Sequence, residues 1–415
     1  MDVELNPIPH GGITAATGFK ACGVHAGFRR NPNKLDMSLL VADEPCVAAG
    51  VFTQNVFCAA PVQLCKDCLN GVGYGTARAV VANSGNANAA TGTVGLDVAY
   101  QSAELVAEVV GCLAEEVLVA STGVIGVPLP LEPYEHLAEA FAQADTNWQS
   151  GHDAAVAIMT TDTHPKECAY SWTSADPAFA GTTFTVGGCC KGSGMIMPNM
   201  ATMISLVTTD FPVTGPAAYA ALKAAADAGF NKVTVDSDTS TNDTCILLAS
   251  GAAAPHSYVS DGVAYEEFCA ALTAVCMELA RKIAIDGEGA TRLITVNVTG
   301  AATEIDADLA ARAIANSPLV KTAIAGRDAN WGRIAAAAGK SGAVFEQENV
   351  DIDIMGMPVM RAGLPVPFSE EEALRRFEQS EIVLDVNLGA GECATRIWTC
   401  DFTHEYISIN GDYRT

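Results

Sequence analysis

The order in which strand-like and helix-like patterns follow one another constrains the fold of this chain more than any other feature. Apolar β-like runs come together early, and only then does a helical pattern begin, at 97–113, with apolar residues at three- and four-residue steps. A doubly wound parallel sheet requires strict alternation of strand and helix, whereas blocks of each are typical of α+β folds. The pattern therefore predicts a layered α+β sandwich.

The same patterns predict individual elements. We expect strands at 38–42, 46–52, 77–84, 182–190, 203–209, 292–299, 382–388 and 395–402, and helices at 97–113, 215–228 and 262–284. A stretch with two prolines and a glycine at 211–218 predicts the junction between two halves. With 415 residues, of which 49% are hydrophobic and 17% charged, the chain is long and apolar enough for two or three domain-sized units.

Charge and cysteine usage exclude several classes of protein. The formal net charge is −25, which repels phosphate backbones, so we expect no nucleic-acid partner. No apolar run reaches the roughly 18 residues that a membrane span needs, and the first residues lack the basic and apolar regions of a secretory signal, so we expect no membrane association. The 14 cysteines are scattered, many in apolar contexts, which indicates reduced thiols in a cytoplasmic protein.

Several motifs that resemble metal or cofactor sites fail on their spacing. Cys65 and Cys68 form a lone CxxC without a second pair or a nearby His, so structural cysteines are the favoured interpretation. The stretch 334–341 has Ile334 where a phosphate loop requires glycine. No HExxH or GxSxG is present, and no His/Cys/Asp cluster has metal-ligand spacing, so we expect neither a metal nor a bound cofactor.

The stretch KGSGMIMPNMATMISLVTTD, residues 191–210, joins a loop containing glycine and proline to a strand-like run that begins after Thr202. A threonine hydroxyl is a weak nucleophile without a neighbouring base, and a threonine at a chain terminus carries that base as its own α-amino group. That amine exists only if the bond after Ala201 is cut. A loop strained at Gly192 and Gly194 would help Thr202 attack the Ala201 carbonyl. The alternative is that Thr202 only begins a strand.

Blocks along almost the whole chain resemble the ornithine acetyltransferase family of arginine biosynthesis, also called glutamate N-acetyltransferase or the ArgJ family. The blocks are KGSGMIMPNMATM (191–203), FNKVTVDSDTSTNDT (230–244), NSGNANAATG (83–92), STGVIG (121–126), TTDTHPK (160–166), DGEGATR (286–292), NWGRI (330–334) and INGDYRT (409–415). They follow the order of the family, so chance does not account for the match.

The resemblance implies a fold, a maturation step and a reaction. The fold is a layered α-β-β-α sandwich of the DmpA/ArgJ-like type, related to Ntn-hydrolases, with a smaller second α/β domain. Self-cleavage between Ala201 and Thr202 would yield an α chain (1–201) and a β chain (202–415), assembled as an α2β2 heterotetramer. Acetyl would pass from N-acetylornithine to Thr202 and then to glutamate in a ping-pong cycle. The resemblance leaves open whether acetyl-CoA is also a donor.

The resemblance also implies roles for individual residues besides the nucleophile Thr202. Thr122 and Gly123 would form the oxyanion hole. Lys191 would bind the substrate carboxylate, and Glu288 would hold the ammonium of Thr202 or the substrate amine. The residues expected to bind substrate are Thr160, Thr161, Lys191, Thr202, Glu288, Asn410 and Thr415. Without the resemblance, ordinary turn, loop or strand positions account for these residue types.

Three other functions share parts of this pattern. A related threonine- or serine-nucleophile amidohydrolase or aminopeptidase would cut itself in the same way but pass the acyl group to water. A variant acetyltransferase with the same donor would serve a specialised pathway. A binding module without activity would remain one uncut chain and form no acetyl-threonine.

Overall fold

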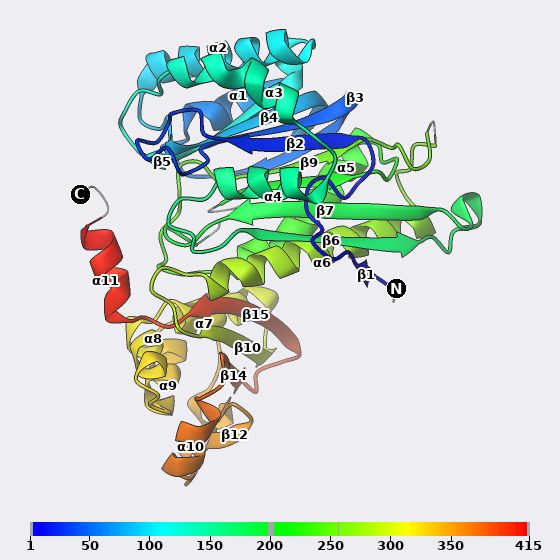
Figure 1. The fold of residues 1–415 in the computed structure, drawn as a ribbon. Helices are drawn as coiled ribbons and strands as arrows, with labels where there is room; N and C mark the ends of the chain where they lie inside the picture. Colours follow the sequence, from blue (N-terminus) through cyan, green and yellow to red (C-terminus); the bar gives the residue numbers. More distant parts are fainter. Residues whose placement is uncertain (1–2, 198–202, 256, 413–415) are drawn as a thin grey trace. The chain divides into compact units, whose positions relative to one another are not determined.

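The computed structural model describes two compact units (Figure 1). The described residues are 3–197, 203–255 and 257–412. The larger unit comprises 1–192, 196–231 and 239–280, and the smaller unit comprises 193–195, 232–238 and 281–415. The larger unit takes segments from both sides of the predicted cleavage point, so it does not correspond to one of the two predicted chains.

A nine-stranded sheet organises the larger unit. In spatial order its strands are β1 (Asn6–Pro7), β6 (Lys166–Thr173), β7 (Thr183–Lys191), β8 (Ile204–Thr209), β9 (Thr244–Ala249), β3 (Met37–Phe52), β4 (Tyr74–Asn86) and β5 (Val117–Val124), and β2 (Phe19–Val24) pairs with β3. The pairs β8–β9 and β4–β5 are parallel. The other neighbouring strands are antiparallel.

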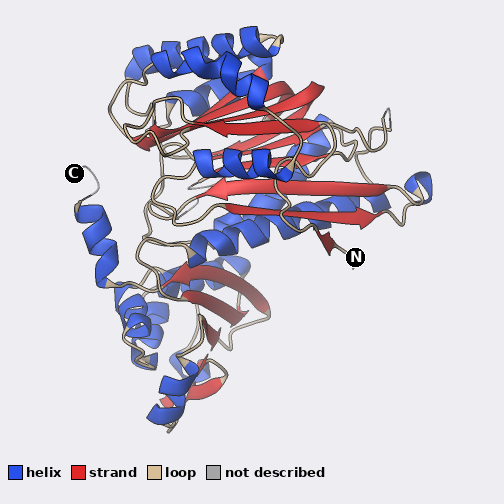
Figure 2. Ribbon diagram, viewed as in Figure 1, coloured by secondary structure: helices blue, strands red, loops and turns tan. Residues whose placement is uncertain are grey.

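The 16-residue strand β3 belongs to two layers of this sheet. Its residues 37–49 pair with β4 and its residues 47–52 pair with β9, with a register shift between Val41 and Cys46. Such irregularities bend a strand. The strands β2 to β5 therefore form one layer and β6 to β9 the other, and Figure 2 shows both layers between helices. Ile204 and Ile246 of the second layer belong to the same buried apolar core as residues of β3 and β4.

Helices cover the outer faces of both layers. The helices α1 (Ala60–Cys68), α2 (Gly92–Val110) and α3 (Leu137–Gln143) cover the first layer, α5 (Gly215–Ala228) packs on β3 and β9, and α6 (Val263–Ile285) runs along β6 and β7 (Figure 1). The thiols of Cys168 and Cys190 donate to α6 carbonyls of Val275 and Leu279, at 3.7 and 3.8 Å. The predicted α-β-β-α sandwich is therefore confirmed.

The smaller unit is built on a six-stranded sheet. Its strands in spatial order are β13 (Leu364–Pro365), β12 (Met357–Arg361), β11 (Asp351–Ile354), β14 (Glu381–Asn387), β10 (Leu293–Ala301) and β15 (Cys393–Cys400). Its helices are α7 (Glu304–Ala315), α8 (Pro318–Ala325), α9 (Trp331–Gly339), α10 (Glu370–Arg376) and α11 (His404–Gly411). Apolar residues of β10, such as Ile294 and Val296, share a buried core with α7 residues such as Ala311 and Ile314. This unit confirms the predicted second α/β domain.

The predicted strands and helices are confirmed with shifts at their ends. The expected strands 38–42 and 46–52 are one continuous strand, because both halves of β3 find partners. The predicted junction at 211–218 is wrong, since this segment lies inside the larger unit. Its Phe211 is fully buried and stacks on Phe268, with ring centroids 4.9 Å apart. Proline and glycine in this segment mark a turn before α5 and no domain boundary.

The cysteines behave as the sequence predicts. All fourteen are described, and all are free thiols, most of them buried. Cys65 of the CxxC pair is fully buried on α1, and its thiol donates to the carbonyl oxygen of Val119 at 3.2 Å. Over the described parts of the chain, no group of three or more His, Cys, Asp or Glu side chains could hold a metal ion. None of the described helices is long and apolar enough to cross a membrane.

The backbone of α4 approaches Gly23 of β2 closely, so a substitution at Gly23 tests how α4 packs on this strand. A Cβ atom built there would lie 1.9 Å from the carbonyl oxygen of Asp153 in α4 (Trp148–Ala157). Because α4 would have to move away from β2, we expect Gly23→Ala to lower the free energy of unfolding by roughly 1–3 kcal/mol. Chemical denaturation measures this change.

Gly339→Ala is the control for this substitution. Gly339 ends α9, and a Cβ built there meets no atom within 4 Å. We expect the control to unfold at the denaturant concentration of the unmodified chain. Equal stability of Gly23→Ala and the unmodified chain would show that α4 does not pack as described.

Candidate functional site

Three strands of the larger unit meet at the start of β8. Lys191, the last residue of β7, pairs with Ile204, the first residue of β8. Ile204 in turn pairs with Thr244, the first residue of β9. The backbone N–H of Thr244 donates to the carbonyl oxygen of Met203 at 2.8 Å. The chain at Met203 is therefore held directly beside the start of β9.

The predicted cleavage point adjoins this three-strand row in the sequence. Ala201 and the predicted nucleophile Thr202 lie outside the described residues. Thr202 is nonetheless covalently bonded to Met203, which the structure describes. Lys191 and Asp243, the residue before β9, therefore belong to the two strand ends that flank the residue following Thr202.

Asp162 joins the end of β7 to the TTDTHPK segment. Its Oδ1 accepts hydrogen bonds from Nζ of Lys166, at 2.6 Å, and from the N–H of Gly192, at 2.7 Å. Its Oδ2 accepts one from the N–H of Thr160, at 3.0 Å. The side chains of Asp162 and Lys166 are both fully buried. A buried ion pair is tolerated only when both charges are paired and hydrogen-bonded, as they are here.

Burial and neighbouring charges shift the pKa values of Asp162 and Lys191. Burial alone would raise the pKa of the Asp162 carboxyl, but the charges of Lys166 and Lys191 outweigh it and lower that pKa to about 2. Burial lowers the pKa of the Lys191 ammonium, and the charges of Asp162 and Asp243 oppose this effect. A partly dehydrated ammonium of this kind is a suitable point charge for a carboxylate.

Arg29 and Asp162 are residues of this region that the sequence analysis missed. The guanidinium of Arg29 donates to the carbonyl oxygen of Met159, just before the predicted residues Thr160 and Thr161. The sequence could have indicated Asp162, because an acid and a lysine four positions apart, Asp162 and Lys166, lie within one family block. The sequence gives no indication of Arg29, since its contact with Met159 spans 130 positions of the chain.

Thr122 and Gly123, the predicted oxyanion pair, lie at the end of β5. Gly123 has φ of +137°, and a Cβ built there would come within 2.3 Å of the carbonyl carbon of Gly85 in β4. The register of β4 against β5 shifts at the same place, between Gly85 and Asn86. Bulges of this kind are over-represented beside active sites. Only glycine fits here, and the oxyanion role remains a prediction.

Asn242 connects the end of β5 to the start of β9. Its side-chain amide donates to the carbonyl oxygens of Ser121, at 2.9 Å, and Ala87, at 2.5 Å. Its side-chain oxygen Oδ1 accepts from the Thr241 hydroxyl at 2.6 Å. Ser121, which precedes the predicted oxyanion residue Thr122, is therefore hydrogen-bonded to Asn242, which precedes Asp243. Sequence reasoning did not single out Asn242, although it lies within a family block.

In the smaller unit, two predicted residues contact each other directly. The amide of Asn410, in α11, donates to Oε2 of Glu288 at 2.6 Å and to the carbonyl oxygen of Tyr406 at 3.0 Å. Glu288 is 6% exposed, and its N–H donates to the carbonyl oxygen of Ser193 at 3.0 Å. The predicted contact residue Thr415 lies outside the described residues.

The C-terminal helix α11 is anchored at several points. Phe402 and Tyr406 stack with their ring centroids 4.8 Å apart. The Tyr406 hydroxyl donates to Oδ2 of Asp236 at 3.3 Å, and the hydroxyl of Thr403 donates to the carbonyl oxygen of Gly289 at 2.7 Å. A chain end is usually frayed. Here the segment that carries Asn410 is packed and hydrogen-bonded.

The two glycines expected to be strained near the predicted cleavage point differ, since Gly192 has φ of +158° and Gly194 has no positive φ. Gly194 is outside the positive-φ region, but a Cβ built there would lie 2.4 Å from the carboxyl atoms of Glu288. The expectation of a strained backbone at Gly194 is therefore wrong, and Gly194 instead makes space for Glu288. A strained non-glycine residue does occur next to it, because Met195 has φ of +56°.

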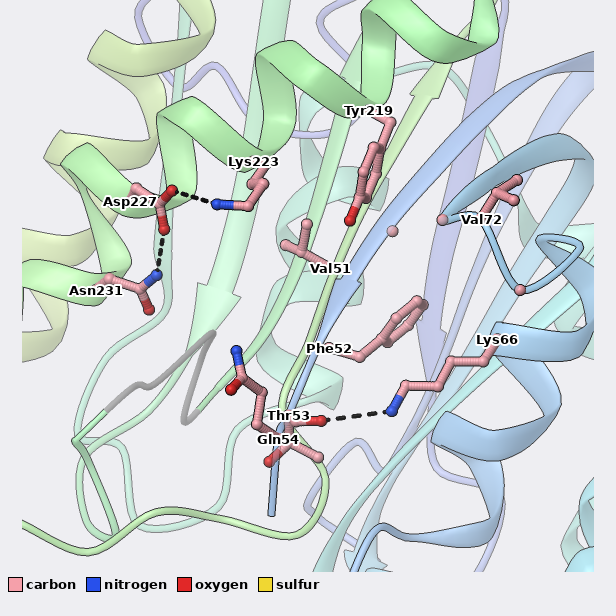
Figure 3. A pocket seen from close by; sticks show the side chains of 13 residues that line it. Val51, Phe52, Thr53, Gln54, Lys66, Val72, Tyr219, Lys223, Asp227 and Asn231 are labelled. Atoms are coloured by element: carbon pink, nitrogen blue, oxygen red, sulfur yellow. Dashed lines mark hydrogen bonds and ion pairs between the residues drawn. The ribbon is translucent and has the colours of Figure 1, made fainter. Parts of the chain in front are cut away.

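A cavity of about 650 Å³ in the larger unit lies between the end of β3 and α5 (Figure 3). Its polar side chains include Lys66, Lys223, Asp227 and Asn231. Lys223 and Asn231 both bond the Asp227 carboxylate, at 2.8 and 2.7 Å. None of the described residues predicted to act in catalysis or substrate binding lines this cavity.

The buried Asp162–Lys166 pair generates a prediction about stability. Asp162→Asn removes the carboxylate that pairs with the fully buried Lys166 ammonium, so we expect the free energy of unfolding to fall by roughly 3–5 kcal/mol at neutral pH. The control is Asp227→Asn, which breaks a Lys–Asp pair of the same four-residue spacing whose side chains are 51% and 46% exposed. There we expect a change within about 1 kcal/mol.

The same pair predicts how stability depends on pH. The pKa of Asp162 in the folded chain is about 2, below its ordinary value of 3.8. Its stabilisation is therefore complete above about pH 4 and is lost as the pH falls towards 2, and it is worth roughly 2 kcal/mol. Denaturation of the unmodified chain and of Asp162→Asn between pH 7 and 2 should give converging stabilities. Parallel curves would contradict the ion pair.

Comparison with known proteins gives consistent results along the chain. A family model described as the ArgJ family matches residues 20–415. The "Arginine biosynthesis bifunctional protein ArgJ" of Symbiobacterium thermophilum is 49% identical over 406 residues, covering 98% of this chain and 99% of its own. The protein of the same name from Dehalococcoides mccartyi is 43% identical over 416 residues, covering all of both chains.

Two solved structures match shorter parts of the chain. One is the arginine biosynthesis bifunctional protein ArgJ of Bacillus halodurans, at 43% identity and a TM-score of 0.49, covering 51% of this chain and all of its own. Another is an ornithine acetyltransferase of Mycobacterium tuberculosis in complex with ornithine, at 38% identity and a TM-score of 0.43, covering 48% of this chain and all of its own. The family model and the full-length relatives are decisive: this chain belongs to the ArgJ family.

Proposed function

We propose that this chain is an acetyltransferase of arginine biosynthesis that moves acetyl from N-acetylornithine to glutamate. Its relatives named as bifunctional arginine biosynthesis proteins match 96–100% of the chain at 41–49% identity, which supports this pathway. The structural observation that carries the proposal is the position of Lys191. Lys191 lies opposite Ile204, two positions after Thr202 in the sequence, and this supports its proposed role as the cation that binds the substrate carboxylate.

Self-cleavage between Ala201 and Thr202 is the proposed maturation step. The chain before the cut ends near β7 and the chain after it begins near β8, and these two strands are hydrogen-bonded neighbours. The α chain (1–201) and the β chain (202–415) would therefore stay joined through one sheet. The freed α-amino group of Thr202 then serves as the base for its own hydroxyl, because such amines titrate near neutral pH. The family resemblance supports an α2β2 assembly of these pieces.

The proposed reaction proceeds in two halves. The Thr202 hydroxyl attacks the acetyl carbonyl of N-acetylornithine, its proton passes to the α-amine and then to the departing ornithine, and acetyl-threonine remains. The amine of glutamate next attacks the acetyl-threonine ester, which regenerates the hydroxyl. Thr122 and Gly123 stabilise the oxyanion in both halves. Ornithine and glutamate both carry an α-carboxylate, so one ammonium, that of Lys191, serves both substrates.

The remaining predicted residues are proposed to bind substrate. Thr160 and Thr161 adjoin Asp162, which bonds the Thr160 N–H and the residue after Lys191. Glu288 and Asn410 are bonded to each other, so a change in one alters the other. Whether acetyl-CoA acts as a second donor is decided by supplying it with glutamate alone and measuring N-acetylglutamate.

Intact masses of the purified protein under denaturing conditions test the proposal. We expect two pieces, one ending at Ala201 and one beginning at Thr202, and incubation with N-acetylornithine should add one acetyl group to the second piece alone. Glutamate should then remove that group and appear as N-acetylglutamate. Release of acetate at a rate independent of glutamate would identify an amidohydrolase instead. A single piece without acetyl would overturn the proposal.

Removal of residues 410–415 tests the role of the C-terminal segment. The truncation deletes Asn410, which bonds Glu288, and Thr415. We expect acetyl transfer to fall by at least about tenfold, while self-cleavage continues, because β7, β8 and β9 are untouched. Ile407→Ser is the control, since Ile407 lies on the same helix and is 72% exposed. Unchanged turnover of the truncated enzyme would remove Asn410 and Thr415 from the site.

A further inference from the structure

Asp243 is a buried acid that no proposed step has used so far. The residue is 1% exposed. No hydrogen bond of full geometry reaches either carboxyl oxygen from the described residues, although Ser240, Thr53 and the backbone of Met203 lie close enough to lower its pKa. A buried acid whose oxygens have no bond of full geometry is costly, and native structures keep few of them. An acid retained in this state therefore calls for a chemical reason.

The backbone holds Asp243 next to the chain that follows the predicted cleavage point. Its carbonyl oxygen accepts the N–H of Thr53 at 3.0 Å, and the next residue, Thr244, donates its N–H to the carbonyl of Met203 at 2.8 Å. Strand pairing fixes the same position, because Thr244 lies opposite Ile204. Asp243 thus stands at the strand end beside Met203, to which Thr202 is bonded.

The electrostatic setting of Asp243 favours its neutral form. Burial raises the pKa of the Asp243 carboxyl well above its usual value, and the neighbouring Ser240 side chain and the charge of Lys191 offset this only in part. A neutral carboxyl has one O–H donor and one free acceptor oxygen. It can therefore give a proton and take a proton at the same time.

Self-cleavage poses a proton-transfer problem that the later acetyl transfer does not have. Before the cut, the nitrogen of Thr202 is part of a peptide bond, so it is no base. The hydroxyl must nevertheless lose a proton, and the departing nitrogen must gain one. A group other than the threonine amine has to carry out both transfers.

We propose that Asp243 is the proton-transfer residue of self-cleavage, an inference that rests on the cleavage proposed above. The hydroxyl oxygen of Thr202 bonds to the carbonyl carbon of Ala201, and the bond from that carbon to the Thr202 nitrogen breaks. One Asp243 oxygen accepts the hydroxyl proton while the other gives its proton to the nitrogen. Asp243 ends neutral, as it began. Water then hydrolyses the ester to a carboxylate at Ala201 and a free hydroxyl at Thr202.

The test follows cleavage of freshly synthesised full-length chain by intact mass. We expect Asp243→Asn, which keeps the shape of the side chain but shuttles no proton, to slow cleavage by at least about 100-fold. Asp210→Asn is the control, because Asp210 follows the other end of β8 and is also buried, but accepts a backbone hydrogen bond from Thr185. The control should be cut at the rate of the unmodified chain. Circular dichroism and denaturation check that each variant is folded.

Hydroxylamine, which cleaves esters, identifies the step at which the variant is blocked. Because Asp243→Asn should stop before the ester forms, added hydroxylamine should not release the two pieces. Release by hydroxylamine would place the block at ester hydrolysis and overturn the proposal. If Asp243→Asn does not fold, Asp243→Glu takes its place. Slower cleavage of this variant supports the proposal, and cleavage at the unmodified rate contradicts it.

The outcomes also separate this inference from the function it rests on. If the unmodified chain is cut and folded Asp243→Asn is cut equally fast, Asp243 has no part in cleavage and the acetyltransferase proposal stands. If the unmodified chain itself stays uncut, self-cleavage fails and the role of Asp243 fails with it.

Discussion

The hydrogen-bonded row across β7, β8 and β9 is the constraint on which the rest of the larger unit depends. β8 has six residues and is fully buried, with β7 antiparallel on one side and β9 parallel on the other. A short central strand of this kind contributes little by itself and is held by its neighbours. It is therefore a suitable place for the proposed chain break, because the strand pairing on both sides would keep β8 in position after the cut.

Several charged side chains of the larger unit are buried together near the end of β7. The chain carries a net charge of −25, yet two cations, Lys166 and Arg29, lie near Lys191 together with the acids Asp162 and Asp243. The buried Asp162–Lys166 pair fixes the end of β7 by a hydrogen bond to Gly192. Burial of the Lys191 ammonium and the opposing charges of Asp162 and Asp243 would suit the carboxylate binding proposed for this residue.

At three positions the structure has no room for a side chain larger than that of glycine. Gly123 lies against the backbone of β4, Gly194 lies against the Glu288 carboxyl, and Gly23 lies against α4. In each case a methyl group would displace a neighbour that the fold or the proposed chemistry needs. The backbone strain expected at Gly194 instead occurs at Met195, whose positive φ is uncommon for a residue with a side chain.

The sequence by itself determined the class of fold, most strands and helices, the family, and a set of candidate residues, because hydrophobic periodicity and contiguous motifs are local properties. It could not show that two predicted strands are one bent strand, or that 211–218 is interior, because these depend on partners distant in sequence. Only burial and contacts between residues distant in the sequence single out Asp162, Asn242 and Asp243 as candidates. Tertiary structure alone decides those properties, since desolvation and strand register arise only when distant segments pack together.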